Sequence, residues 1–152
     1  MIAGPTFGYK TDISIDRKFG FIRGAAVTSA THGGGKMLRN VIQMDNNASA
    51  AWADTAYRPK ANETWLNRNM LARRIHRRKP NAKPMSEATS RANGKKSTVR
   101  ARVEHVFAHQ KNRFGLFIRT IGLARVEAEL TLANLAYNMD RLVFHERRTA
   151  TG

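Results

Sequence analysis

A single acidic residue stands among bases in the stretch Ser97-Thr-Val-Arg-Ala-Arg-Val-Glu-His-Val-Phe-Ala-His-Gln-Lys111. On a helix, which turns by about 100° per residue, Arg100, Glu104 and Lys111 fall within about 40° of one another. A carboxylate held between two cations suits metal binding beside a phosphate backbone. The alternative is an ordinary amphipathic helix with a solvated row of ion pairs. An apolar stripe beside this row would face a core and consists of Val99, Val103, Val106, Phe107 and Phe114.

A second acidic residue, Asp54, ends the segment Ala48-Ser-Ala-Ala-Trp-Ala-Asp54. We interpret this segment as a short buried strand that runs into a turn ending at Pro59. Ligand-binding groups of α/β sheets usually lie at the carboxyl ends of strands. Because Asp is also a poor strand residue, its position suggests a functional carboxylate. The alternative role for Asp54 is to cap a helix that begins near Pro59.

The rest of the pattern predicts a hairpin followed by alternating helices and strands. Residues 9–16 alternate with period two, residues 17–20 form a tight turn, and residues 21–28 return antiparallel. We expect helices over 33–44 and 59–68 and a strand over 70–75. The longest helix is expected over 121–144, with an apolar surface so broad that a sheet or a partner must cover it. Asn134 and Asn138 lie on that surface and are expected to be hydrogen-bonded core amides.

Taken together, these segments resemble the DDE transposases of bacterial insertion sequences, in the insertion-sequence-five-like group of the insertion-sequence-four-like superfamily. The resemblance covers essentially the whole chain. The superfamily often has a tyrosine three residues before the arginine of the acidic helix, where this chain has Ser97. The segments that carry the resemblance are, in chain order, Phe7-Gly-Tyr-Lys10 with the strand ending in Asp16, Trp52-Ala-Asp-Thr-Ala-Tyr-Arg58, Arg100-x3-Glu104-x6-Lys111 and Leu132-Ala-Asn-Leu-Ala-Tyr-Asn-Met139.

The resemblance implies an α/β fold, a ribonuclease-H-like mixed sheet flanked by helices, here lacking its first, central strand. Only Met1 to Thr6 precede the Gly-Tyr-Lys segment, too few residues for the strand that carries the first Asp of the family. We therefore expect residues 1–152 to be the C-terminal part of a DDE catalytic domain. Its parts would be a hairpin at 7–28, the second-acid strand, helix and strand at 48–75, a basic mobile loop at 79–96, and the third-acid and terminal helices at 97–146.

The resemblance also implies DNA transposition, in which three carboxylates hold two Mg²⁺ or Mn²⁺ ions for strand cleavage and transfer at insertion-sequence ends. Asp54 and Glu104 correspond to the second and third catalytic acids and metal ligands. Because the first acid is missing, we expect the chain alone to be inactive. Asp12 and Asp16, on one face of the hairpin, are candidates to replace it. The residues expected to contact DNA are Lys10, Arg58, Arg73, Arg74, Arg77, Arg78, Arg100, His105 and Lys111.

Charge independently favours a nucleic-acid partner. The chain has 27 Lys and Arg against 11 Asp and Glu, a formal net charge of +16, which gives a salt-sensitive attraction to phosphates. The densest run, 73–79, leads into the segment 80–96, which Pro and Gly punctuate. We interpret that segment as a loop that orders on DNA, and the alternative is solvated surface. There is no cysteine and no apolar run near the roughly 18 residues of a membrane span, so we expect a soluble, intracellular protein. The resemblance further implies a bacterial cytoplasmic, nucleoid-associated location.

Other classes of protein and site remain open. His105 and His109 lie four residues apart, but the order Glu-His-x3-His is not that of zinc hydrolases. Expected partners are double-stranded DNA, an upstream transposase fragment and a second copy on DNA. One alternative is a non-catalytic basic remnant that binds DNA, or a nucleoid- or ribosome-associated chain. The other is a different ribonuclease-H-like nuclease, such as a junction resolvase.

Overall fold

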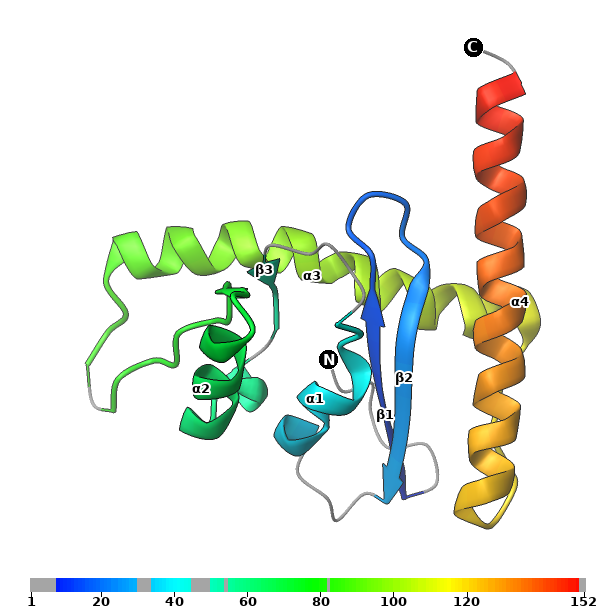
Figure 1. The fold of residues 1–152 in the computed structure, drawn as a ribbon, viewed down its shortest axis with the longest axis horizontal. Coiled ribbons are helices and arrows are strands. Elements are labelled where there is room, and N and C mark those ends of the chain that lie inside the picture. The colour runs from blue at the N-terminus through cyan, green and yellow to red at the C-terminus, as the bar shows by residue number, and fades with distance from the viewer. Residues whose placement is uncertain (1–7, 30–33, 45–49, 54, 82, 151–152) are drawn as a thin grey trace.

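The computed structural model describes residues 8–29, 34–44, 50–53, 55–81 and 83–150. They form a mixed α/β arrangement with two small sheets (Figure 1). The elements are, in chain order, β1 (Tyr9–Ile15), β2 (Ile22–Ser29), a 3-10 turn (Gly34–Met37), α1 (Leu38–Val41), β3 (Ala50–Ala51), a second 3-10 turn (Thr55–Tyr57), α2 (Lys60–Arg68), β4 (Ala72–Arg73), α3 (Glu87–Phe114) and α4 (Leu123–Ala150).

Strands β1 and β2 form the predicted antiparallel hairpin, in register from Tyr9 opposite Ser29 to Ser14 opposite Gly24. The turn forms around Asp16, whose carboxylate accepts backbone N–H groups from Lys18 at 2.8 Å, Phe19 at 3.0 Å and Phe21 at 3.1 Å. Gly20 closes the turn at φ +78°, a left-handed conformation that glycine adopts without strain. The described residues therefore contain an antiparallel hairpin from Tyr9 to Ser29.

Strands β3 and β4 form a separate parallel pair. The pairing continues beyond the strands, because the N–H groups of Arg74 and His76 donate to the carbonyl oxygens of Ala51 and Ala53 at 2.8 and 3.2 Å. Helix α2 connects the two strands. Together with α1 they enclose one core cluster, made of Leu38, Ala53, Tyr57, Leu66, Leu71 and Ile75.

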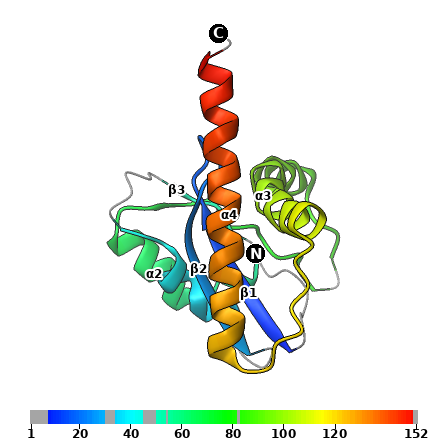
Figure 2. The same ribbon diagram turned by 90° about the vertical axis from the view of Figure 1, so that its right-hand side faces the viewer.

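Helices cover both faces of the hairpin. Ser14 of β1 donates its hydroxyl to the carbonyl oxygen of Val41 in α1. Successive strand residues point to opposite faces, so Ile13 lies on the other face, where it packs with Val106 of α3 and Tyr137 of α4. Helix α4 runs beside β2, and its last turns extend beyond the rest of the chain (Figures 1 and 2). The hairpin is therefore the middle layer, between α1 and the pair of long helices.

Helix α4 also protects the outer edge of β2. The Asn138 amide accepts the N–H of Ile22 at 2.8 Å and donates to its carbonyl oxygen at 2.9 Å, as a neighbouring strand would. Asn134 accepts a hydrogen bond from Gln110 at 2.8 Å. The prediction that both asparagines are hydrogen-bonded is confirmed, but both amides are half-buried and do not belong to the core.

Three features differ from the sequence-based expectations. Helix α3 begins at Glu87, so residues 87–96 of the expected loop are helical; the Ser86 hydroxyl caps this start by accepting the N–H of Thr89. The helix expected over 33–44 is reduced to a 3-10 turn and one α-helical turn. The apolar surface of α4 is only half covered, since 67% of Leu132, 62% of Met139 and 57% of Leu135 remain exposed.

A single mixed sheet was expected; the described residues instead form two separate two-stranded sheets, one antiparallel and one parallel, with no strand joining them. No helix in the described ranges is both long and apolar enough to cross a membrane.

Candidate nucleic-acid interface and acidic site

Four arginines gather around Lys96 of α3. The Lys96 ammonium group donates to the carbonyl oxygen of Ile75 at 2.8 Å. Partial burial, and then repulsion from the neighbouring arginines, lower the pKa of Lys96 below its ordinary value. Positive potential is therefore concentrated at this point of the surface. We call the group the basic cluster; it consists of Arg58, Arg73, Arg74, Arg77 and Lys96.

One carboxylate organises two of these arginines. Glu63 of α2 lies 3.4 Å from the Nε of Arg58 and also pairs with Arg73. Both guanidinium side chains stay more than a third exposed. Glu63 therefore fixes two guanidinium groups next to each other while neutralising one of their charges. Arg74, Arg77 and Arg78 follow along the chain and are exposed.

The arginine-rich segment is attached to the body of the structure by His76, which is 7% exposed. In the tautomer with the proton on Nδ1, this ring donates to the carbonyl oxygen of Ala53 at 3.2 Å and accepts from the Ser97 hydroxyl at 3.0 Å. The Asn93 side-chain amide accepts the backbone N–H of Arg77 at 3.1 Å and donates to the Arg77 carbonyl oxygen at 3.0 Å. Arg77 and its neighbours are thus presented from a fixed backbone.

The predicted row on the acidic helix lies on α3. Arg100 and Glu104 are 3.4 Å apart at i,i+4, with the Glu104 side chain 54% exposed. His105 and Lys111 are exposed on the same helix. Exposed pairs of this kind contribute about 0–1 kcal/mol to stability, so the pair is not a strong structural element. It is available to reorganise when a ligand approaches Glu104.

Asp54 lies outside the described residues, and its separation from Glu104 is therefore not described. Buried residues lie before and after it along the chain. Ala53 is buried and accepts the hydrogen bonds from His76, and Tyr57 is buried with its hydroxyl donating to Asp12.

Neither hairpin acid takes the place of a third carboxylate beside Glu104. Asp16 already accepts the backbone N–H groups of the turn. Asp12 is fully buried and shares a face of β1 with Ser14, toward α1, whereas α3 packs on the other face. Lys10 lies on the same face as Asp12.

The described residues do not by themselves fit a two-metal centre. No three His, Asp or Glu side chains gather anywhere among them. Of the two expected metal ligands only Glu104 is described, and its partner is Arg100. His109 pairs with Asp140 of α4 at 3.1 Å, and Arg113 lies 2.6 Å from the same carboxylate. That group connects α3 with α4.

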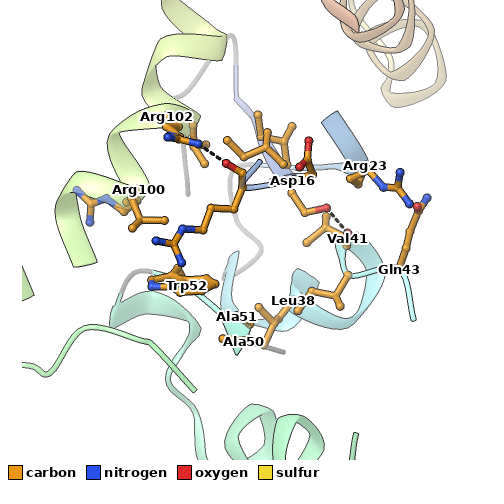
Figure 3. A pocket seen from close by; sticks show the side chains of 18 of the residues that line it. Asp16, Arg23, Leu38, Val41, Gln43, Ala50, Ala51, Trp52, Arg100 and Arg102 are labelled. Carbon is orange, nitrogen blue, oxygen red and sulfur yellow. Dashed lines mark hydrogen bonds between the residues drawn. The ribbon is translucent and has the colours of Figure 1, made fainter. Parts of the chain in front are cut away.

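A cavity of about 420 Å³ separates the hairpin from β3 and lies between α1 and α3 (Figure 3). Figure 3 shows Arg100, Arg102 and Trp52 on one side of it and Arg23 and Gln43 on the other. Arg17 stacks over the Trp52 ring at 4.9 Å, and its carbonyl oxygen accepts a hydrogen bond from Arg102.

No curated protein and no solved structure matches the chain significantly. One protein family does match it, the family described as Transposase DDE domain, over residues 5–139. That range contains the hairpin, both strand pairs, the basic cluster, all of α3 and more than half of α4. Because the match covers most of the chain, the protein belongs to the transposase DDE domain family, whose role is in DNA transposition.

Proposed function

We propose that this chain is the DNA-binding C-terminal part of an insertion-sequence-five-like DDE transposase and that it does not cleave DNA by itself. In the complete enzyme it would act on insertion-sequence ends, in the bacterial cytoplasm on the nucleoid, with a second copy on the DNA. The family match supports the role in transposition. The observation that carries the binding proposal is the basic cluster, held at one place by Glu63, His76 and Asn93.

DNA binding follows from the chemistry of this cluster. Phosphate next to Lys96 would relieve the repulsion that lowers its pKa. The rigid forks of Arg74 and Arg77 can each hold a phosphate through two N–H groups. Arg100, His105 and Lys111 would extend this contact along α3, and Arg78 would extend it along the arginine-rich segment. Such contacts position the duplex and read little sequence.

The catalytic part of the proposal concerns Asp54 and Glu104 as the second and third acids. The divalent metal ions of the complete site would supply charge stabilisation at the transferred phosphate. What the described residues contribute is a carboxylate on helix α3, with Arg100 paired to it one turn away. A third acid must come from outside the described residues.

A salt titration tests the binding proposal. The affinity of the intact chain for a duplex of about 20–30 base pairs should fall linearly with log salt concentration. Removing one cation that neutralises a phosphate should reduce the slope by about one unit. We expect a flatter slope in fluorescence anisotropy for the variant R73A/R74A/R77A/R78A.

A matched control separates local contacts from overall charge. The second variant removes the same number of charges from exposed arginines elsewhere, R119A/R125A/R147A/R148A. Its salt slope should stay closer to that of the parent chain. Equal slopes for the two variants would contradict the assignment of the interface to the arginine-rich segment.

A second candidate function is a non-catalytic DNA-binding protein. The observation that favours it is that no three acidic or histidine side chains gather among the described residues. It predicts that DNA binding is independent of Mg²⁺ and that no addition of missing sequence yields cleavage. A different ribonuclease-H-like nuclease has no specific observation in its favour.

A further inference from the structure

The turn between β1 and β2 is held against the second half of α4, which continues past it toward the C-terminus (Figure 1). The carbonyl oxygen of Phe19 accepts a hydrogen bond from the Nε of Arg141 at 3.2 Å. In the tautomer with the proton on Nε2, the His145 ring donates to the same oxygen at 2.8 Å. Two segments that are far apart in the sequence therefore form one surface.

Aromatic rings gather on this surface around His145. The His145 ring meets that of Phe19 edge-on and that of Phe144 at a steep angle, each with ring centroids 5.4 Å apart. Phe19 is nevertheless 42% exposed and Phe144 45% exposed, and neither belongs to a core cluster of the described residues. The hydrogen bonds to the Phe19 carbonyl already hold the turn in place. The two phenylalanine rings are therefore available to a ligand.

A cation lies over each of these exposed rings. The Nζ of Lys18 is 4.8 Å from the centroid of the Phe19 ring. The guanidinium carbons of Arg141 and Arg148 are 4.9 and 5.7 Å from the centroid of the Phe144 ring. We call this surface the stacking patch; it consists of Lys18, Phe19, Arg141, Phe144, His145 and Arg148.

Bases outnumber acids in the two segments that form the patch. Residues 16–21 and 141–148 contain five Lys and Arg against two acids, Asp16 and Glu146. The Asp16 carboxylate is engaged by backbone N–H groups of the turn. The patch therefore attracts a negatively charged ligand, and its exposed rings favour a ligand with a flat π face.

An unpaired nucleotide has both of these properties. Its base can stack on an aromatic ring while its phosphate pairs with Lys or Arg. In a duplex the bases are stacked on one another, so their faces cannot reach a protein ring. Phosphates that approach the patch would draw Lys18 and Arg141 toward them, and the ring faces beneath these cations would become free for bases.

We propose that the stacking patch binds an unpaired DNA strand, with bases on Phe19 and Phe144 and phosphates at the three cations. The patch selects the form of the strand and not its sequence, because every base has a π face. It shares no residue with the basic cluster, to which we assign duplex binding. Only the choice of DNA over RNA rests on the proposed function.

Ligands that differ only in their bases test the stacking. The probes for the intact chain are an oligodeoxyuridylate of about twelve nucleotides and an abasic strand with the same number of phosphates. Fluorescence anisotropy at about 0.2 M salt reduces the contribution of the phosphate contacts. We expect the strand with bases to bind at least about tenfold more tightly than the abasic strand. Equal affinities would overturn the proposal.

A variant locates the stacking on the protein. Phe144→Leu removes the π face and keeps an apolar side chain, so it should weaken binding of the oligodeoxyuridylate about tenfold. Its affinity for the abasic strand and for a duplex should change by less than about twofold, because no charge is altered. Phe144→Trp keeps a π face and should retain the binding.

The matched control is Phe117→Leu. Phe117 is 61% exposed and has Arg119 over its ring at 5.1 Å, but it lies outside the patch. This variant should bind the oligodeoxyuridylate as the parent chain does. A loss equal to that of Phe144→Leu would contradict the proposal, as would an equal loss of duplex binding in Phe144→Leu.

Photo-crosslinking tests the contact without a protein variant. Iodouracil in place of uracil should join the irradiated strand to peptides that contain Phe19 or Phe144, as identified by mass spectrometry. Cross-links confined to other peptides would mean that the rings do not touch bases. Oligouridylate of the same length is the RNA counterpart. If it bound at least about tenfold more tightly than the deoxy strand, the patch would be an RNA site and the proposal would be wrong.

Discussion

Burial sets Asp12 apart from Asp16, although only three residues separate them. Asp12 is fully buried, accepts the Tyr57 hydroxyl and has no partner for Oδ2 among the described residues. Burial therefore raises the pKa of Asp12 above 3.8, although the Tyr57 hydrogen bond and Lys10 act in the opposite direction. Burial also raises the pKa of Asp16, but the hydrogen bonds that its carboxylate accepts from the backbone N–H groups of Phe19 and its neighbours outweigh this effect. The pKa of Asp16 is therefore lowered.

The two acids should give opposite dependences of stability on pH. Because the folded-state pKa of Asp12 is raised above 3.8, the free energy of unfolding falls as pH rises from 3.8 through that raised pKa. The lost stability does not return at higher pH. The free energy of unfolding of Asp12→Asn, relative to that of the parent chain, should therefore increase as pH rises. Ionised Asp16 stabilises the fold above pH 3.8, and this stabilisation is lost as pH falls through the lowered pKa of Asp16. Asp16→Asn should thus lose stability at neutral pH and match the parent at acidic pH.

Urea unfolding of the three chains from about pH 3 to about pH 8 measures both trends. Stability curves for Asp12→Asn and the parent chain that stay parallel over that range would contradict the burial argument. The Asp16→Asn chain is the internal control. It carries the same type of substitution in the same hairpin, but its stability relative to the parent chain should change with pH in the opposite direction.

Contacts between individual residues could be predicted from the sequence where the two residues are close together in the chain. Helical spacing was enough to place Arg100 and Glu104 together, as the 3.4 Å pair confirms. His76 and the partnership of Asp12 with Tyr57 were not predicted, because each joins segments distant in sequence. The one available signal for His76 was the pair Ile75-His76, two less polar residues inside a run of arginines. The closeness of Asp54 to Glu104 stays a prediction.

At the scale of elements, the contact between α1 and the hairpin depends on Gly24. A Cβ at Gly24 would overlap the carbonyl oxygen of Val41, which belongs to backbone and cannot turn aside. We expect Gly24→Ala to destabilise the chain by about 1–3 kcal/mol, as overpacking does. Chemical unfolding measures this.

Gly94 provides the opposite case within α3. A Cβ at Gly94 meets nothing within 4 Å, and glycine inside a helix costs about 1 kcal/mol relative to alanine. Gly94→Ala should therefore stabilise the chain by up to about 1 kcal/mol and lengthen the protection of 87–96 in hydrogen exchange. Unchanged stability would mean that the first turns of α3 are not helical in solution.

Element boundaries show why the start of α3 was predicted as a loop. The segment 87–98 has hardly any apolar residue, so the periodicity that marks a helix is absent. Its helicity comes instead from the Ser86 cap and from contacts made by Asn93 and Lys96 with the arginine-rich segment. The hairpin and α2, in contrast, carry both periodicity and turn residues, and their positions were predicted.

At the scale of the whole molecule, a cavity separates the hairpin from the parallel strand pair. Glu104 stands on α3, the helix that forms one wall of this cavity. The described residues offer no third acid there. A strand that fills this cavity would lie between the two sheets and bring its own side chains between the segment before Asp54 and α3.

We therefore expect an Asp-bearing strand, fused through a flexible linker to the N-terminus, to raise the melting temperature and to permit Mg²⁺- or Mn²⁺-dependent cleavage at insertion-sequence ends. The same fusion with Asn in place of Asp should be equally stabilised, because docking depends on the backbone and the apolar faces, but should not cleave. Glu104→Gln in the active fusion should reduce cleavage at least about a hundredfold, while DNA affinity at fixed salt changes by less than about twofold, since one of many charges is altered.

The outcomes of this experiment separate binding of the strand from catalysis. Stabilisation without cleavage in the Asp fusion would mean that the strand docks and would contradict the catalytic assignment of Asp54 and Glu104. Cleavage without slowed hydrogen exchange at the cavity-lining residues 13–18 and 50–53 would support the assignment and place the added strand elsewhere. Metal-dependent cleavage by the unfused 152-residue chain, abolished by Asp12→Asn but not by Arg125→Glu, would mean that Asp12 leaves its buried position to act as the third acid.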